Sequence, residues 1–315
     1  MKTAELNQTH NGRQLSELVS VDSPKAVLEE VTYILNLISG ELDPMPVTST
    51  YYSILDMFRG DLPGYQACNT EYHDFQHTSQ VFLAMTRLIH GAVVDGEKLN
   101  DRQITLGLMA ALFHDSGYIQ ETDDTVGTGA KHTATHVERS MEFFGAFGSN
   151  IGLDEESTLA VQSIILCTNL SVDISSIAFS TPTIGLLGRL LGTADVLAQM
   201  ADRIYLEKLL FLYHEFRESG IGGYENEVDL LRKTMGFYDF IAGRLATSLD
   251  RTDRFMKSHF ITRWEIHEDL YQTAIEKQRL YLEQIVSLPD GDPLSFLKRG
   301  NIVMRVRGQN TEETA

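Results

Sequence analysis

Apolar residues recur at the period of an α-helix along most of this chain, and that spacing narrows the possible folds sharply. In residues 73–89, for example, apolar side chains stand at positions 75, 81, 82, 85, 88 and 89, and Gly91 ends the pattern. No segment alternates apolar and polar residues over a length useful for a β-strand. The sequence therefore predicts an all-α fold, a compact helical bundle with helical extensions at both ends.

Glycine, proline and polar breaks divide this pattern into separate helices. The helix that Asp101 caps and Gly117 ends is apolar on nearly every side, so it should lie buried at the centre. Within a long later helix, Gly185, Gly188 and Gly192 should let another helix approach closely. The other expected helices cover 24–39, 48–59, 73–89, 131–147, a segment opened by Ser157, 182–219, 225–248 and 253–287.

We expect five parts along the chain, and no fixed-period repeat is present. We expect a polar tail over residues 1–20, an N-terminal helical extension over 21–50 and a central domain over 51–250. A C-terminal helical extension over 251–305 and a fraying tail over 306–315 complete the division.

The charge balance argues against some classes of partner. Acidic residues outnumber basic ones 44 to 26, which gives a formal net charge of −18. Such a surface repels polyanions, so we expect no general binding to nucleic acid or to an anionic membrane. A small phosphate substrate remains compatible with this charge, because a metal ion can reverse the local field.

Cysteine usage and hydropathy bear on the compartment. Cys68 and Cys167 are too few for a disulfide framework or a zinc site, and we interpret both as small core residues in a reduced compartment. No apolar run approaches the length of a membrane span, and the N-terminus MKTAELNQTHNG lacks the apolar core of a signal peptide. The sequence therefore predicts a soluble cytoplasmic protein.

Histidine placement is the strongest indication of chemistry. Four of the ten histidines form two pairs at a spacing of four, His73/His77 and His132/His136, which would share a helix face. Such a pair alone is more often solvated than metal-binding, and His132 is either a second-metal ligand or a surface histidine. We assign no chemistry to the scattered His90, His214, His259 and His267.

Two acidic residues stand in unusually apolar surroundings. His114 and Asp115 end the most apolar helix, and Asp195 lies in the apolar run LLGTADVLA. A buried carboxylate needs a partner, which for Asp195 could be Arg189 or Arg203. Taken together with the histidine pairs, however, the imidazoles and carboxylates form a set typical of a divalent metal site.

Five segments in order resemble the catalytic domain of class I cyclic nucleotide phosphodiesterases, within the HD superfamily of metal-dependent phosphohydrolases. His77, the His114-Asp115 pair and Asp195 match the H…HD…D signature of that superfamily. The resemblance covers residues 51 to about 250. The segments are Tyr72–His77 (similar to YHNxxH), Leu108–Asp115 (similar to LAALxHD), Ile165–Ser171 (similar to ILATDMS), Thr193–Leu197 (similar to xADLS) and Gly236–Ile241 (similar to GFIDFI).

This resemblance implies a catalytic domain over 51–250 with two divalent metal ions, drawn from Mn, Mg, Fe and Zn. Asp115 would bridge both ions and take part in catalysis. Waters held by His136 and Thr168 would complete the second site. The ligands of the first ion would be His77, His114, Asp115 and Asp195.

The resemblance also implies an activity, the cleavage of a small nucleotide-like phosphoester by a metal-bridging hydroxide. His73 would be the general acid, because expulsion of an alkoxide needs a proton. Phe237 matches the aromatic residue that clamps a purine ring.

The chain departs from the family pattern at three positions. Tyr118 stands in SGY where the phosphodiesterases have a second histidine, and Asp74 replaces an asparagine. Thr234 occupies the position of the purine-reading glutamine. A threonine lacks the paired donor and acceptor with which an amide reads a purine edge, so we expect little selectivity between cyclic AMP and cyclic GMP.

Two other functions stay open at this point. An oxygen-activating di-iron protein of the HD fold would use more histidine ligands, which His132 and His136 could supply. A non-catalytic HD-fold sensor or binding module would not need the intact ligand set. A homodimer is a further expectation, although we favour packing of the C-terminal helix on its own domain over a dimer face built from Tyr271, Leu280, Tyr281 and Ile285.

Overall fold

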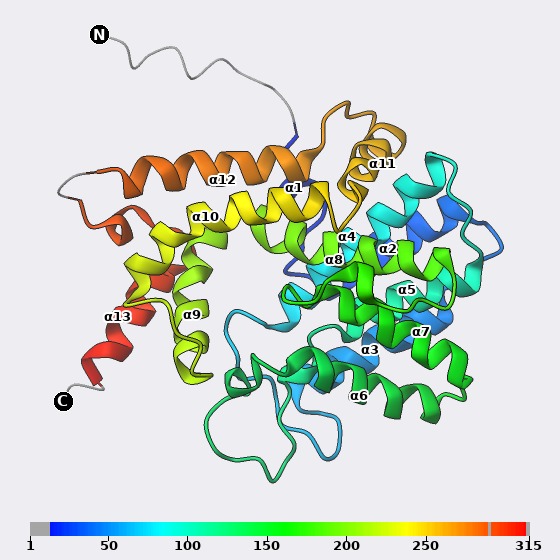
Figure 1. The fold of residues 1–315 in the computed structure, drawn as a ribbon, viewed down its shortest axis with the longest axis horizontal. Coiled ribbons are helices and arrows are strands. Elements are labelled where there is room, and N and C mark those ends of the chain that lie inside the picture. Colours follow the sequence, from blue (N-terminus) through cyan, green and yellow to red (C-terminus); the bar gives the residue numbers. More distant parts are fainter. Residues whose placement is uncertain (1–12, 289–290, 313–315) are drawn as a thin grey trace.

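A computed structural model describes residues 13–288 and 291–312, which Figure 1 draws as coloured ribbon. Within these residues the chain forms α-helices and short 3-10 turns, with one isolated β-bridge and no strand. The predicted all-α fold is therefore confirmed. The α-helices are α1 (Leu15–Leu18), α2 (Pro24–Ile38), α3 (Met45–Arg59), α4 (Phe75–Val94), α5 (Asp101–Phe113), α6 (His136–Asn150), α7 (Glu155–Ile165), α8 (Pro182–Ala201), α9 (Tyr205–Glu218), α10 (Glu227–Ala246), α11 (Phe255–Trp264), α12 (Leu270–Val286) and α13 (Ile302–Glu312).

Helices α4 and α8 form the centre of the bundle and pack against each other. Helix α4 also packs against α2, α5 and α11, and its side chains from His77 to Ala92 are buried. Helix α5 is buried from Leu106 to Phe113, as its all-round apolar character predicts. In Figure 1, α9, α10, α12 and α13 gather on one side of this centre, and α3, α5, α6 and α7 on the other.

Helix α8 approaches the turn after α7 closely, because its glycines leave room. A Cβ added to Gly188 would lie 2.5 Å from Cys167 Sγ, and one added to Gly192 would lie 2.7 Å from Cys167 O. A close approach is thus present at Gly188 and Gly192, but the segment that approaches is the 3-10 turn Leu166–Thr168 rather than another α-helix. Cys167 is buried in the core as expected, whereas Cys68 is only partly buried.

The two histidine pairs do not share helix faces, which corrects the sequence interpretation. The Asp74 side chain accepts a hydrogen bond from His77 N at 2.8 Å and caps α4, so the helix begins at Phe75 and His73 precedes it. His132 lies in a 3-10 turn before α6, and His136 is the first residue of that helix. The point at which each helix begins therefore separates the members of each pair.

Two long expected helices are each divided. The segment 182–219 breaks after Ala201, where Asp202 leaves the helical region with ψ 132° and accepts a hydrogen bond from Ile204 N. The segment 253–287 breaks at Glu265, which adopts a left-handed conformation with φ 56°. The Asp269 side chain then caps the start of α12.

The ends of the described chain also differ from the expected tails. Helix α1 and the buried Val19 lie within the part expected to be a polar tail. Helix α13 continues past residue 306 to Glu312, and Val306 is buried; residues 313–315 of the expected tail lie outside the described residues. On α12, Tyr271 and Ile285 are buried within the chain, which agrees with packing of this helix on its own domain, whereas Leu280 is half-exposed.

One described helix, α8, is long and apolar enough to span a bilayer by length and composition. This corrects the expectation that no apolar run approaches that length. Of its most apolar window, 78% is buried inside the protein, as for the central helix of a bundle.

Candidate metal centre

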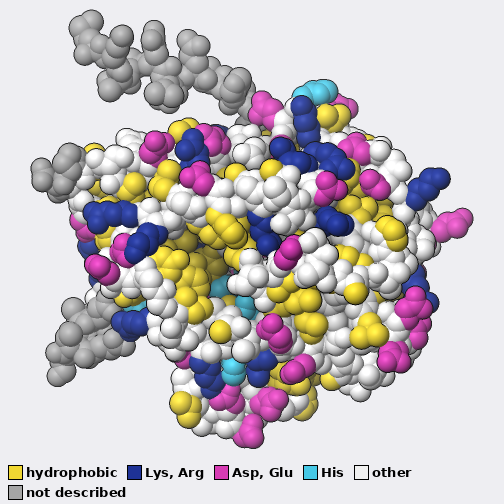
Figure 2. Space-filling view, in the orientation of Figure 1, with side chains coloured by type: hydrophobic (Ala, Val, Ile, Leu, Met, Phe, Trp, Pro, Cys, Tyr) yellow, Lys and Arg dark blue, Asp and Glu magenta, His cyan; other side chains and the backbone are white. Residues whose placement is uncertain are grey.

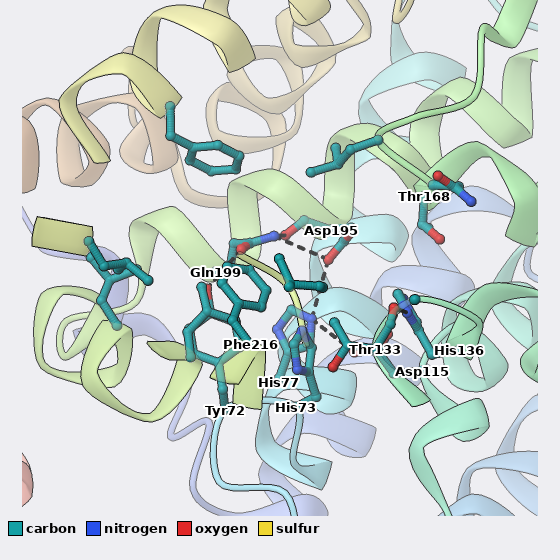
Figure 3. Close-up of a pocket in the computed structure, with 18 of the residues that line it drawn as sticks. Tyr72, His73, His77, Asp115, Thr133, His136, Thr168, Asp195, Gln199 and Phe216 are labelled. Atoms are coloured by element: carbon teal, nitrogen blue, oxygen red, sulfur yellow. Dashed lines mark hydrogen bonds and ion pairs between the residues drawn. The ribbon is translucent and has the colours of Figure 1, made fainter. Parts of the chain in front are cut away.

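Four side chains from three segments meet beside the start of α4; Figure 3 labels three of them, all but His114. His77 lies in the first turn of α4, His114 and Asp115 directly follow α5, and Asp195 lies on α8. His77 Nε2 lies 3.2 Å from Asp195 Oδ1 and 3.4 Å from both Asp115 Oδ2 and His114 Nε2. His114 Nε2 lies 3.3 Å from Asp115 Oδ2 and 3.8 Å from Asp195 Oδ1.

This donor set fits a divalent metal ion. Ligand atoms about 2.1 Å from one ion lie roughly 3.0–3.4 Å apart at octahedral or tetrahedral angles, close to the separations observed here. Asp115 Oδ2 is buried and has no hydrogen-bond partner among the described residues. Because a buried carboxylate oxygen without a donor is costly, a cation among these four side chains would stabilise it.

Backbone carbonyls fix the orientation of two imidazoles. A carbonyl oxygen can only accept, so His114 Nδ1 donates to Ala111 O at 2.8 Å and its Nε2 lone pair faces the carboxylates. His136 Nδ1 donates to Thr133 O at 2.7 Å in the same way. Its Nε2 then lies 3.7 Å from Asp115 Oδ1, on the side of that carboxylate away from His114.

The electrostatics of the centre favour positive charge. Burial opposes protonation of His114, but Asp115 and Asp195 outweigh it and raise the pKa of that imidazole to about 9. Burial likewise opposes ionisation of Asp115, yet His114, His73 and His77 hold its pKa well below the usual range. In metal-free protein a proton on His114 thus partly neutralises the carboxylates, and a metal ion would compete with it.

His73 lies beside this set and is held by a glutamate that the sequence did not reveal. His73 Nδ1 lies 2.6 Å from Glu215 Oε2, and Glu215 Oε1 accepts a hydrogen bond from Tyr72 N at 2.8 Å. Burial lowers the pKa of His73, but Glu215, on α9, reverses this effect and raises it overall. A charged residue within the apolar run LLFLYHEF is the signal that could have indicated Glu215.

The ring of Tyr118 contacts both His73 and His136. Its ring stacks on His73 with centroids 4.3 Å apart and on His136 with centroids 4.6 Å apart. Its hydroxyl lies 3.5 Å from His73 Nε2. Burial and the nearby Asp115 raise the pKa of this phenol well above its ordinary value, so the ring is neutral. Tyr118, at which this sequence departs from the motif that it resembles, therefore stacks on two histidines of the site.

The expected second-site residues divide into two groups. His136 and Thr168 line the same pocket as Asp115, and burial lowers the pKa of His136. Thr168 Oγ1 donates to Ile165 O at 2.9 Å, which leaves its lone pairs as acceptors. His132 instead lies 3.2 Å from Asp124 Oδ2 in the loop before α6 and does not line this pocket. Of its two interpretations, the surface histidine is the one that this position supports.

Asp195 meets the two histidines rather than an arginine. Neither Arg189 nor Arg203 forms an ion pair with it among the described residues. Gln199 lies one turn later on α8, and its Nε2 is 3.5 Å from Asp195 Oδ1. Tyr72 OH donates to Gln199 Oε1 at 2.8 Å and holds that amide in place. After Glu215, Gln199 is thus the second residue beside the site that the sequence did not indicate.

A pocket of about 660 Å³ opens beside the donor set, and Figure 2 shows hydrophobic and histidine side chains gathered in the hollow of this face. Two aromatic pairs contribute to its walls: Phe216 stacks with Tyr224, and Phe237 with Phe240. Thr234 also lines the pocket, as predicted, but its hydroxyl donates to Leu230 O at 2.8 Å. The pocket thus offers apolar and aromatic contact beside the polar donor set.

No family model matches this chain, and no curated protein matches it. The motifs and the geometry above therefore carry the functional argument on their own.

Proposed function

We propose that this chain is a metal-dependent phosphoric ester hydrolase of the HD superfamily, similar to its phosphodiesterase branch. The supporting observation is the donor set of His77, His114, Asp115 and Asp195, of which all but His114 line a 660 Å³ pocket that His73, paired with Glu215, also lines. A ligand set, a proton donor and space for a substrate thus occur together.

The chain's residues would hold one divalent ion with this donor set and a second beside Asp115, near His136 and Thr168. Such ions supply a water of lowered pKa and positive charge for the phosphoryl oxygens. The bond from His114 Nδ1 to Ala111 O keeps the ring fixed, so little reorganisation is needed when the site is filled.

His73 would hold the proton for the leaving oxygen. Glu215 accepts from Nδ1, which leaves Nε2–H as the group that can reach a substrate. The raised pKa favours the protonated form of the ring, which is the form that a general acid needs. The stacked Tyr118 holds the plane of the ring. Proton transfer to an alkoxide typically accounts for about two to four decades in rate.

The pocket walls indicate the kind of ester. Phe237 and Phe240 on one side and Phe216 and Tyr224 on the other suit a flat or apolar group. Because the Thr234 hydroxyl is already bonded, no donor–acceptor pair at this position reads a purine edge. We therefore propose a small nucleotide-like phosphodiester with little discrimination between adenine and guanine.

The test is elemental analysis of the purified protein, followed by a phosphoester panel with Mn, Mg, Fe and Zn. We expect about two transition-metal ions per chain and metal-dependent hydrolysis. His77→Asn should lose metal and activity together, whereas His132→Asn should keep both, because His132 lies outside the pocket.

Protein that contains no metal and gains no activity from any of the four metals would contradict the proposal. Two irons with dioxygen consumption and no ester hydrolysis would replace it with the oxygenase alternative. Selective turnover of cyclic AMP or cyclic GMP alone would contradict the substrate part, which rests on Thr234.

A further inference from the structure

A second aromatic pair lines the pocket beside the candidate metal centre, apart from the Phe237 pair on α10. Phe216 lies in the last turn of α9 and Tyr224 in the loop between α9 and α10, and their rings stack with centroids 5.7 Å apart at 20°. Both side chains are partly buried and both line the pocket. Figure 3 shows Phe216 and His136 on opposite sides of Asp195. The second pair is therefore available to a molecule that binds at the donor set.

The two aromatic pairs lie at different turns of α10. One face of this helix lines the pocket, with residues three or four apart from Leu230 to Phe240. Lys233 Nζ lies 5.7 Å from the Tyr224 ring centroid, which places the second pair beside an early turn of α10. Phe237 and Phe240 follow later, and a rise of 1.5 Å per residue separates them from Lys233 by about 6–10 Å along the axis. The pocket thus has two aromatic surfaces rather than one.

The pocket offers one place for a phosphate. Its lining includes Asp115 and Asp195, around which metal ions would lie, and a single lysine or arginine among the described lining residues, Lys233. Lys233 Nζ already donates to Asp229 Oδ2 and to Gly223 O, each at 2.7 Å. A second phosphate away from the metal ions would meet no free cation there, and an unpaired buried anion is costly. The net charge of −18 also opposes longer, more highly charged strands.

A nucleobase is the flat group that suits both surfaces. Stacking of a base on an aromatic ring needs no hydrogen-bond readout, which fits a pocket whose Thr234 hydroxyl is already bonded to Leu230 O. Neighbouring bases of one strand lie about 3.4 Å apart when stacked, so surfaces about 6–10 Å apart would hold two bases splayed. A volume of 660 Å³ lies within the range of about 300–1,000 Å³ typical of pockets that enclose drug-sized ligands.

We propose, resting on the function proposed above, that the substrate is an acyclic dinucleoside monophosphate. Its one phosphodiester would lie at the donor set, with one base on Phe237 and the other on Phe216, which Tyr224 backs. Water adds across one P–O ester bond: its oxygen joins phosphorus, and the departing ribose oxygen takes the proton of His73, which the water's own proton replaces. The products are a nucleoside and a nucleoside monophosphate. A cyclic mononucleotide, with one base, would leave the second surface unused.

Binding to metal-free full-length protein tests the two surfaces without the reaction. The probes are adenylyl-adenosine and the methyl ester of adenosine monophosphate, which carry the same single charge and differ in the second base. Equilibrium dialysis should give a Kd for adenylyl-adenosine at least about fivefold lower, the weak end of base–aromatic stacking. Phe216→Leu keeps an apolar side chain but loses the flat surface, so it should weaken binding of adenylyl-adenosine far more than binding of the methyl ester.

Turnover by metal-loaded protein is the second readout. Phe216→Leu should lower kcat/KM for adenylyl-adenosine about fivefold or more and change that for the methyl ester much less. Phe237→Leu removes the surface that both probes use, so it should lower kcat/KM for both. Phe143→Leu is the matched control, because that ring stacks with Tyr65 outside the pocket, and it should change neither value.

Equal binding of the two probes by wild type would overturn the proposal, and so would an equal loss of both in Phe216→Leu, because a single base would then lie between the two pairs. If Phe216→Leu fails to fold, an unchanged preference in Tyr224→Leu overturns it. Hydrolysis of the methyl ester and cyclic AMP without hydrolysis of adenylyl-adenosine would overturn this inference alone. Hydrolysis of no ester with any metal would contradict the proposed function, and the substrate assignment with it.

Discussion

Two clusters that each contain buried basic side chains lie along helix α4, and their balance of positive and negative groups differs. Near its start, His77 meets His114 and the carboxylates of Asp115 and Asp195 within 3.2–3.4 Å. Towards its end, Arg87 and His90 lie among His259 and aromatic rings, and no carboxylate pairs with Arg87 among the described residues. Among the described residues, the first cluster leaves a carboxylate oxygen without a donor, and the second leaves guanidinium donors without an acceptor.

The difference shows that burial alone does not define a site. Both clusters are buried, and both contain facing imidazoles: His77 and His114 at 3.4 Å, and His90 and His259 at 3.2 Å. What differs is the sign of the unpaired group, a carboxylate oxygen in one and a guanidinium edge in the other. The comparison can be tested by removing charges from each cluster.

The largest effect should come from Asp115→Ala. This change removes the carboxylate that faces both His114 and His136, so metal content should fall to near zero. Ester hydrolysis should fall more than about a thousandfold, because bound metal ions stabilise the transition state by several kcal/mol. Elemental analysis and a hydrolysis assay measure both. Asp124→Ala removes a carboxylate outside the pocket and is the matched control. If Asp115→Ala retained its metal, Asp115 would not be a metal ligand.

The second effect concerns His73, which borders the metal cluster without joining it. His73→Asn should keep its metal content and lose about two to four decades in turnover of an alkyl ester. A nitrophenyl ester, whose leaving group needs no proton, should lose far less. An equal loss on both esters, or a loss of metal, would remove the acid role from His73. Turnover on the two esters and metal content are measured on one preparation.

The third prediction uses metal removal and pH. In metal-free protein the pKa of His114 is raised to about 9, above 6.5 in the unfolded chain. The folded state therefore holds its proton more tightly, and this stabilisation is complete below pH 6.5 and lost as pH rises through 9. Chemical denaturation should show a loss of about 3 kcal/mol over that range. Metal-loaded protein should lose much less, because the metal replaces the proton; equal losses would contradict this.

The smallest effect belongs to the second cluster and has the opposite sign. Burial, with Arg87 and His90 nearby, holds the pKa of His259 well below 6.5. The folded state therefore disfavours a proton that the unfolded chain accepts, so stability should fall as pH drops below 6.5. His259→Gln should reduce that acid-side loss and leave the loss between pH 6.5 and 9 unchanged. Melting temperatures at pH 5, 6.5 and 9 test this, and an unchanged acid-side slope would contradict it.

The members of the candidate metal centre could be predicted from local sequence. The residue types and their apolar surroundings indicated His77, His114, Asp115 and Asp195 as a group, and the structure brings them together. Helix boundaries were less predictable, because short polar side chains set them. Asp74, for example, caps α4 and thereby places His73 before the helix.

The sequence by itself determined the all-α class, since helical periodicity and breaks are local, and it determined which side chains could ligate a metal. Only the tertiary structure decided that Glu215 holds His73 across 142 residues and that Arg87 keeps two donors unpaired. The physical reason is the distance along the sequence over which each interaction acts. Periodicity and capping act over three or four residues, whereas a partner or its absence depends on how α4, α8, α9 and α12 pack.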